Sequence, residues 1–296
     1  MAALNYAEQY SRELAQAYPN VLNFGRLWST ENSIKYKFID AKTIKIPIIS
    51  TKGRVAGNRD TIGSFTRNFD NSWETKTLEN HRQWQTLVHP QDVNQTNMTA
   101  SIANVTKVMN EEQKFPEMDA YLISKLYSLK NTKESITQET ADLTVENVLA
   151  KFDTLMDKMD EARVPQTGRI LYCDTFTKTL IDNAIALSRT TGTNVIQRAV
   201  TRLEEVDVIS VPSFLMKTEY TFAEGFVAGG SAKDIAMLLV HPSAVLPVVS
   251  YEFAQMQPPS ALTQGKYVYF EESFEDVFIL DKKHDAIQFV VKKEQA

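Results

Sequence analysis

The chain has 296 residues, of which 43% are hydrophobic and 23% are charged, and its net charge is −5 at pH 7. These values are typical of globular proteins and exclude a disordered or collagen-like chain. No apolar run approaches the roughly eighteen residues that a membrane-spanning helix needs. The first ten residues lack the basic and apolar regions of a secretory signal, so we expect none.

The sequence offers little for catalysis or metal binding. Cys173 is the only cysteine, which excludes an intrachain disulfide and a zinc site of four cysteines, and its apolar neighbours favour a buried, inert thiol. None of the four histidines lies three or four residues from another. The phosphate-loop, dinucleotide-binding, nucleophile-elbow and H-E-x-x-H motifs are absent. We therefore expect no catalytic residue, no cofactor and no metal.

The first 35 residues are tyrosine-rich and amphipathic. Apolar residues at helical spacing predict a short helix that ends before Pro19; they are Ala7, Tyr10, Leu14, Ala17 and Tyr18. From Val21 to Trp28 the pattern indicates an apolar extended segment that docks elsewhere.

The stretch from Ile44 to Val88 predicts one long β-hairpin with a polar tip. Isoleucines alternate with Lys45 and Pro47 in the first arm, and a polar stretch with three glycines follows. The second arm contains Trp73, Thr75, Thr77, Trp84, Thr86 and Val88. A two-stranded ribbon of this length is marginal in water, so we expect it to lie across a neighbouring copy of the chain.

Positive charge is concentrated in this region, since Lys35 to Arg67 contains eight bases and two acids, a net charge of +6. This distribution is either a mixed solvated surface or a basic arm that meets an acidic patch on the next subunit. Exposed ion pairs contribute only about 0–1 kcal/mol each, so such contacts would set register more than affinity. The candidate assembly residues are Lys45, Lys52, Arg54, Arg59, Arg67 and Trp73 in the loop, and Glu111, Glu112, Glu117 and Asp119 in the acidic patch.

Helical spacing from Met98 to Leu129 continues on both sides of Pro116. The proline either kinks one long helix or begins a second helix, and we favour one long kinked helix. The polar stretch Asn131–Gln138 then indicates a domain boundary.

A compact α/β region follows. The spacing predicts a helix over Leu143–Arg163, and Arg169–Cys173 reads as a buried strand that leads into a helix reaching Leu187. Val206–Val211 and Ile235–Val240 are further predicted strands.

The last part of the chain is predicted to be mostly antiparallel strand. We expect a short helix ending near Met256, and then strands at Tyr267–Phe270, Phe274–Leu280 and Ala286–Lys292. Residues 281–285 would be the turn between the last two strands.

Direct, sequence-specific nucleic-acid binding is disfavoured. Phe65, Phe69 and Trp73 lie near arginines and could stack on bases. The whole chain is acidic, however, whereas specific nucleic-acid binders carry a strong basic footprint.

Five stretches spread over nearly the whole chain carry a family resemblance: Ala3–Ala7, Ala17–Pro19, Val21–Gly25, Asn110–Ala120 and Phe270–Leu280. They are similar to major capsid proteins of tailed bacteriophages, from a family found in phages of Gram-positive bacteria. The order of predicted elements also resembles the Johnson fold (the Hong Kong 97 type) of these proteins. This implies an α+β fold with an N-terminal arm, a long extended β-hairpin loop, a spine helix in a peripheral domain and a compact axial α/β domain.

Mapped onto this sequence, the resemblance divides the chain into five parts. They are an N-terminal arm at 1–37, the extended loop at 38–90, a peripheral domain with the spine helix at 91–134, an axial domain at 135–265, and C-terminal strands at 266–296 that return to the peripheral and axial sheet.

The implied function is that of a major capsid (head) protein that self-assembles into hexamers and pentamers of an icosahedral shell enclosing double-stranded DNA. The implied partners are copies of the chain, a separate scaffolding protein, a portal, and DNA contacted non-specifically. No membrane is involved, and the protein would be found in the virion after assembly in the host cytoplasm.

Two alternatives remain open. The first is an encapsulin-like compartment shell, which would need a groove for cargo peptides; the sequence shows no signature of one. The second is a soluble α/β enzyme built around residues 135–265 with a scattered active site.

Overall fold

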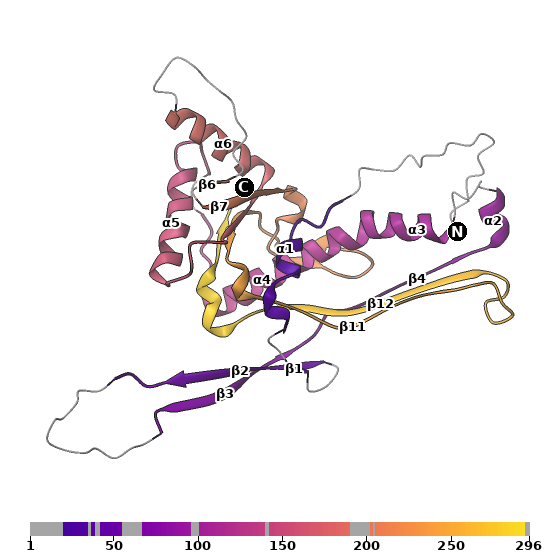
Figure 1. Cartoon of the computed structure of the whole chain (residues 1–296). Helices are drawn as coiled ribbons and strands as arrows, with labels where there is room; N and C mark the ends of the chain where they lie inside the picture. The colour runs from indigo at the N-terminus through magenta and orange to yellow at the C-terminus, as the bar shows by residue number, and fades with distance from the viewer. Residues whose placement is uncertain are drawn as a thin grey trace.

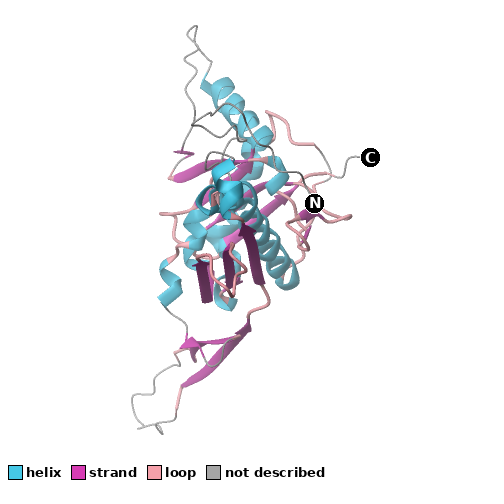
Figure 2. Ribbon diagram, turned by 90° about the vertical axis from the view of Figure 1, so that its right-hand side faces the viewer, coloured by secondary structure: helices cyan, strands magenta, loops and turns pink. Residues whose placement is uncertain are grey.

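The computed structural model describes residues 20–34, 37–38, 42–54, 67–95, 101–139, 142–189, 202–203 and 205–293 (Figure 1). Figure 1 shows a body of helices and strands from which two ribbons extend in different directions. In Figure 2, turned by 90°, the two-stranded ribbon also stands clear of the body.

A five-stranded sheet forms the centre of the body. Its strands in spatial order are β13 (Ile287–Val291), β10 (Ile235–Val240), β5 (Ile170–Asp174), β7 (Val206–Val211) and β6 (Arg202–Leu203). β5 and β7 run parallel and the other neighbours run antiparallel. Every residue of β5 and β10 is buried, as expected where both faces of a sheet are covered. The strands predicted for these segments are confirmed.

One face of this sheet is covered by helices α5 (Val148–Glu161) and α6 (Thr175–Arg189). The predicted β-α unit is confirmed, because α6 directly follows β5, and β5 pairs in parallel with β7. Cys173 points into this core and is fully buried, which raises the pKa of its thiol to about 12. The thiol is therefore protonated at neutral pH.

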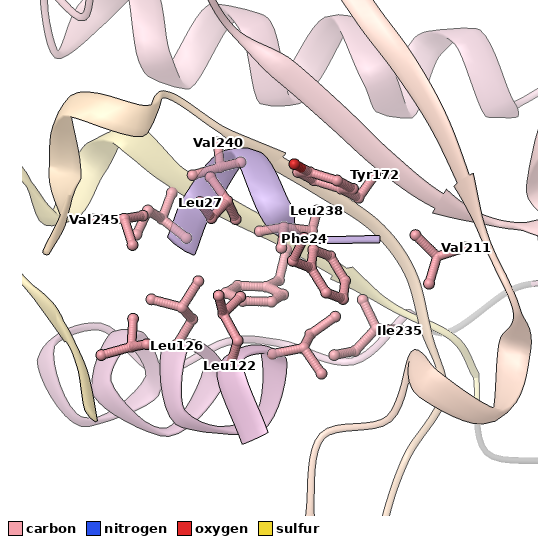
Figure 3. Close-up of a cluster of buried hydrophobic side chains, with 14 of the residues drawn as sticks. Phe24, Leu27, Leu122, Leu126, Tyr172, Val211, Ile235, Leu238, Val240 and Val245 are labelled. Atoms are coloured by element: carbon pink, nitrogen blue, oxygen red, sulfur yellow. The ribbon is translucent and has the colours of Figure 1, made fainter. Parts of the chain in front are cut away.

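The opposite face is covered by α1 (Gly25–Trp28) and by the end of the long helix (Figure 3). Phe24 and Leu27 pack with Leu122 and Leu126 against the sheet, and the Phe24 ring lies 4.7 Å from that of Tyr172. The segment predicted to be extended between residues 21 and 28 is therefore partly helical, and that prediction was wrong. The predicted helix before Pro19 lies outside the described residues.

The long helix runs from Ile102 to Lys133 as α3 (Ile102–Met109), the π-helical turn η2 (Asn110–Lys114) and α4 (Phe115–Lys133). The Ser101 hydroxyl caps its start by accepting from the backbone N–H of Asn104 at 3.4 Å. Pro116 lies directly after the π turn, where a wider helical turn accommodates a residue that cannot donate to the preceding turn. The prediction of one long helix that continues through Pro116 is confirmed, and its irregular turn lies just before the proline.

A three-stranded antiparallel sheet forms the longer ribbon, in the order β11 (Val245–Gln257), β12 (Tyr267–Ile279) and β4 (His81–Val88). The predicted helix near Met256 was wrong, since this segment pairs with β12 along almost its whole length. The valines and aromatic residues of β11 suit a pleated, half-buried surface, and pairing decided the conformation.

The shorter ribbon is a hairpin of β2 (Thr43–Thr51) and β3 (Phe69–Thr77), with β1 (Lys37–Phe38) added at its base. The prediction of a single hairpin reaching Val88 was wrong, because β4 belongs to the other ribbon. Leu78 is buried, and the Asp276 carboxylate accepts from the backbone N–H of Glu79 at 2.9 Å. These contacts redirect the chain between the two ribbons.

The two C-terminal strands do not pair with each other. β12 joins the longer ribbon and β13 joins the central sheet, so the expected turn at 281–285 is a short 3₁₀ segment between two sheets, η5 (Asp281–Ala286). The remaining short elements are η1 (Glu31–Ile34), α2 (Pro90–Gln95), η3 (Ser213–Leu215), β8 (Tyr220–Thr221), β9 (Val227–Ala228) and η4 (Pro242–Ala244).

Candidate assembly interface

The β2–β3 hairpin has one inward face and one uncovered face. Residues that pair across an antiparallel ribbon share a face, which places Lys45, Pro47, Ile49, Phe69 and Trp73 together. On this face Ile49 is 67% exposed, Phe69 55% and Trp73 53%. Three large apolar side chains in one exposed row are typical of a surface that a partner covers.

The inward face holds the hairpin to its own subunit at the base only. Ile44 and Ile46 are buried against Leu246, Val248 and Phe278 of the rest of the chain. Toward the tip the pattern of burial ends, because most residues from Pro47 to Arg54 are exposed. The hairpin is therefore anchored at one end and free of its own body at the other.

An ionic cluster reinforces this anchor. The Lys76 ammonium lies 2.8 Å from the Glu74 carboxylate and 3.1 Å from that of Asp281. Burial lowers the pKa of Lys76, but hydrogen bonds and charge attraction from the two acids outweigh it, and the pKa lies above its usual value. The Lys282 ammonium also donates to the carbonyl of Ile49 at 3.1 Å. The base is thus held by apolar and charged contacts together.

The structure places five of the six predicted loop residues on this hairpin. Lys45 and Trp73 share the uncovered face, and Lys52 and Arg54 are exposed where β2 ends. The Arg67 guanidinium lies over the Phe69 ring at 4.7 Å, and its Nε donates to the Phe69 carbonyl at 3.0 Å. Arg59 lies outside the described residues. The role of these side chains in assembly stays a prediction.

The predicted acidic patch does not hold together as a surface. Asp119 is fully buried and accepts hydrogen bonds from the backbone N–H groups of Asn23 at 2.8 Å and Phe24 at 3.1 Å. Burial raises the pKa of Asp119, and these hydrogen bonds oppose the rise. Its carboxylate fastens the N-terminal segment to the long helix, so Asp119 is not part of an exposed patch. Helical spacing contained the signal, since Asp119 shares a face with buried Leu122 and Ile123.

The other three acids of that prediction differ in their surroundings. Glu117 is held by Arg82, whose Nε lies 2.6 Å from its carboxylate. The Glu111 carboxylate lies 3.9 Å from the Lys107 ammonium, and the backbone carbonyl of Glu111 accepts a hydrogen bond from the backbone N–H of Asn20. Glu112 is half-buried on the π turn. Glu111 and Glu112 are thus the two members that stay accessible as acidic contacts.

The longer ribbon carries an aromatic surface that was not predicted from the sequence. Tyr251 and Phe253 stack with ring centroids 6.4 Å apart, and Phe253 lies 6.2 Å from Phe270 on the neighbouring strand. Leu87 is also exposed at the edge of this sheet. The aromatic residues at 251 and 253 alternate as in a strand and could have indicated this surface, but the segment was expected to be helical.

Comparison with known proteins identifies the fold. No protein-family model matches the chain, and no curated protein matches it. Solved structures of phage capsids do match over almost its whole length.

Three of these structures illustrate the likeness. A structure of the bacteriophage PhiM1 mature capsid matches with a TM-score of 0.69 at 11% sequence identity, covering 99% of this chain and 93% of that one. A capsid structure of cyanophage P-SCSP1u matches with a TM-score of 0.66 at 12% sequence identity, covering 98% of this chain and 94% of that one. A structure of Mycobacterium phage Che8 gives 0.63 at 12% identity, covering 98% of both chains.

The chain therefore has the α+β fold of phage capsid proteins, and the fold that the sequence resemblance implied is confirmed. Within the described ranges, no helix is long and apolar enough to cross a membrane. Among the same residues, no three His, Cys, Asp or Glu side chains are grouped so that they could hold a metal ion.

Proposed function

We propose that this chain is the major capsid subunit of a tailed bacteriophage and that its copies form the hexamers and pentamers of an icosahedral shell. The observation that carries the proposal is the pair of half-covered ribbons on a subunit with a phage capsid fold. A sister subunit is the partner that can cover both ribbons in a repeating way. The protein would then be a structural component of the virion.

The apolar faces supply the affinity of these contacts. Ile49, Phe69 and Trp73 on the hairpin and Tyr251 and Phe253 on the longer ribbon are exposed in the single subunit. Each contact is small, so a misplaced subunit can leave again during assembly. Many such contacts act together in a closed shell because each one raises the effective concentration of the next.

The charged residues supply register. The tip residues Lys52, Arg54 and Arg59, with Lys45 and Arg67, would approach acidic groups of the neighbour, including Glu111 and Glu112. We propose the N-terminal arm, extended loop, peripheral domain and axial domain with the boundaries given above. The predicted boundary after residue 134 falls at the end of α4, although residues on both sides share one core.

The shell would enclose double-stranded DNA without gripping it. Phosphate contacts scale with lysine and arginine, and the chain carries a net charge of −5. A separate scaffolding protein would guide assembly in the host cytoplasm, and a portal would occupy one vertex.

Electron microscopy of the purified chain, alone and with a candidate scaffolding protein, tests the proposal. We expect capsomer rings or closed shells. A stable monomer at high concentration whose melting temperature shifts with a small ligand would instead support the α/β enzyme. Shells that form without a scaffold and retain a co-purified enzyme would support the encapsulin-like compartment.

A double substitution tests the electrostatic part. Arg54→Glu with Arg59→Glu reverses charge at the hairpin tip, where Arg54 is exposed. We expect impaired assembly, seen by light scattering, with a nearly unchanged melting temperature of the isolated subunit. Normal assembly of this variant would show that these charges do not set the register between subunits.

A further inference from the structure

A cleft of about 700 Å³ lies between the long helix, the longer ribbon and the loop at 223–225. Lys114 and Glu117 line it from the helix, and Arg82, Glu271 and Glu275 line it from strands β4 and β12. With Glu224 from the loop, the walls carry four carboxylates against two permanent cations. The cleft is therefore set up for a positively charged group.

Both resident cations already have carboxylate partners. Arg82 pairs with Glu117 at 2.6 Å and also donates to the carbonyl of Ala223 at 3.3 Å. Lys114 pairs with Glu271, which also accepts from the Tyr269 hydroxyl at 2.9 Å. Neither cation is left over to neutralise a further acid.

Glu224 and Glu275 are the carboxylates that remain; Glu224 is exposed, and only Glu275 is buried. The Glu275 side chain lines the cleft, only 8% of the residue is exposed, and no hydrogen bond or ion pair holds its carboxylate among the described residues. Burial raises its pKa to about 7, Lys114 opposes the rise, and Glu252, Glu117 and Glu271 add to it. A buried carboxylate without a partner is costly, and a cation entering the cleft would remove that cost.

We propose that this cleft receives a basic side chain, Lys52 or Arg54, from the hairpin tip of a second copy of the chain. This inference rests on the proposed function and names the acceptor site of the assembly contact. The sequence around the tip carries a net charge of +6, and the side chains of Lys52 and Arg54 have no partner among the described residues. Figure 1 shows hairpin β2–β3 extending away from the β11–β12–β4 ribbon, which supplies cleft residues, so we assign the tip to a second copy.

Access and ligand chemistry support a side chain from outside. Arg82, Gln83 and Trp84 are consecutive residues of β4, the edge strand of its sheet, so the cleft opens beside that edge. The carboxylates here do not form a metal-holding group in the described part of the chain. The cleft already pairs one guanidinium and one ammonium group with carboxylates, so a further group of this kind fits its chemistry.

The contact is tested by comparing assembly of the full-length wild-type chain with that of the Glu275→Gln variant. Glutamine keeps the shape of the side chain and removes its charge. We expect the subunit concentration at half-assembly to rise at least roughly tenfold, because a buried charged contact is lost. The matched control is Glu272→Gln, the same change three residues away on the opposite face of β12, which should leave this concentration unchanged. Equal behaviour of the two variants would overturn the proposal.

A double-mutant cycle identifies the occupant. If the tip fills the cleft, Lys52→Gln with Arg54→Gln should have almost no further effect in the Glu275→Gln background. Effects that multiply would mean that another cation, for example one from a scaffolding protein, fills the cleft, and the proposal would be wrong. A wild-type chain that forms no particles would contradict the proposed function itself, which is a different outcome.

Chemical crosslinking gives a residue-level readout that does not depend on assembly strength. Particles made from equal amounts of isotopically light and heavy chains are treated with a zero-length carbodiimide and digested. We expect mixed light–heavy peptides that join Lys52 to a carboxylate of the 271–275 segment. Lys52 crosslinked only to other carboxylates would place the tip elsewhere and refute the assignment.

Discussion

The body and the two ribbons differ in how many of their faces are covered. Strands β5 and β10 expose no residue, because α5 and α6 pack on one face and α1 and α4 pack on the other. The hairpin buries one face at its base, and the longer ribbon leaves Tyr251 and Phe253 uncovered. The body is therefore covered on both sides within the single chain, whereas each ribbon keeps an uncovered face.

This comparison predicts the largest loss of stability for a truncation in the body. Phe152 is almost fully buried between α5 and the central sheet, so Phe152→Ala should lower the free energy of unfolding by about 3–5 kcal/mol. Urea unfolding of the isolated subunit measures it. A loss below about 1 kcal/mol would mean that the body is not the stable unit described here.

The next largest effect is expected at the joint between the N-terminal segment and the long helix. Asp119→Ala leaves the backbone N–H groups of Asn23 and Phe24 without their acceptor and should cost about 2–3 kcal/mol. Glu112→Ala, on the same helix but half-buried, is the matched control and should stay within about 0.5 kcal/mol. Equal losses would show that the two acids play similar roles after all.

A gain of stability that depends on pH is expected at Glu275. Its pKa is raised from 4.5 to about 7, so the folded subunit binds this proton more tightly than the unfolded chain and loses stability as pH rises through that interval. Glu275→Gln should therefore stabilise the subunit above pH 7 by at most about 3 kcal/mol, with the gain fading toward roughly pH 4. Urea unfolding at several pH values measures it, and a gain that is constant with pH would contradict a buried carboxylate.

The smallest effect on the subunit is expected on the hairpin. Trp73 is 53% exposed, so Trp73→Ala should change the free energy of unfolding by only about 0.5 kcal/mol. Its effect should appear in assembly, measured by light scattering, where the uncovered face meets a neighbour. If Trp73→Ala greatly lowered the free energy of unfolding of the isolated subunit but left assembly normal, the contrast between body and ribbons would be wrong.

Segments with a strong local pattern were predictable from sequence. Helix α5 repeats apolar residues at helical spacing, and β10 is an unbroken apolar run, so each signals its own conformation and burial. The long helix was predicted across Pro116 for the same reason. The basic tip was also visible, because net charge along a segment does not depend on folding.

Other features were decided by contacts between distant residues. Strand β11 takes its conformation from pairing with β12, and β4 leaves the hairpin because Asp276, almost two hundred residues away, holds the N–H of Glu79. Asp119 looked like one more surface acid until the N-terminal segment folded over it. The cleft around Glu275 likewise exists only where the helix, sheet and loop meet.

The sequence by itself determined the long helix, α5, α6, the buried strands of the central sheet and the basic tip, because spacing and charge express these locally. The resemblance to phage capsid proteins came from matching stretches of residues. Only the tertiary structure decided which strands pair, which carboxylates are buried and which faces stay uncovered. The physical reason is that pairing and burial depend on residues far apart in the chain, and no local pattern contains that information.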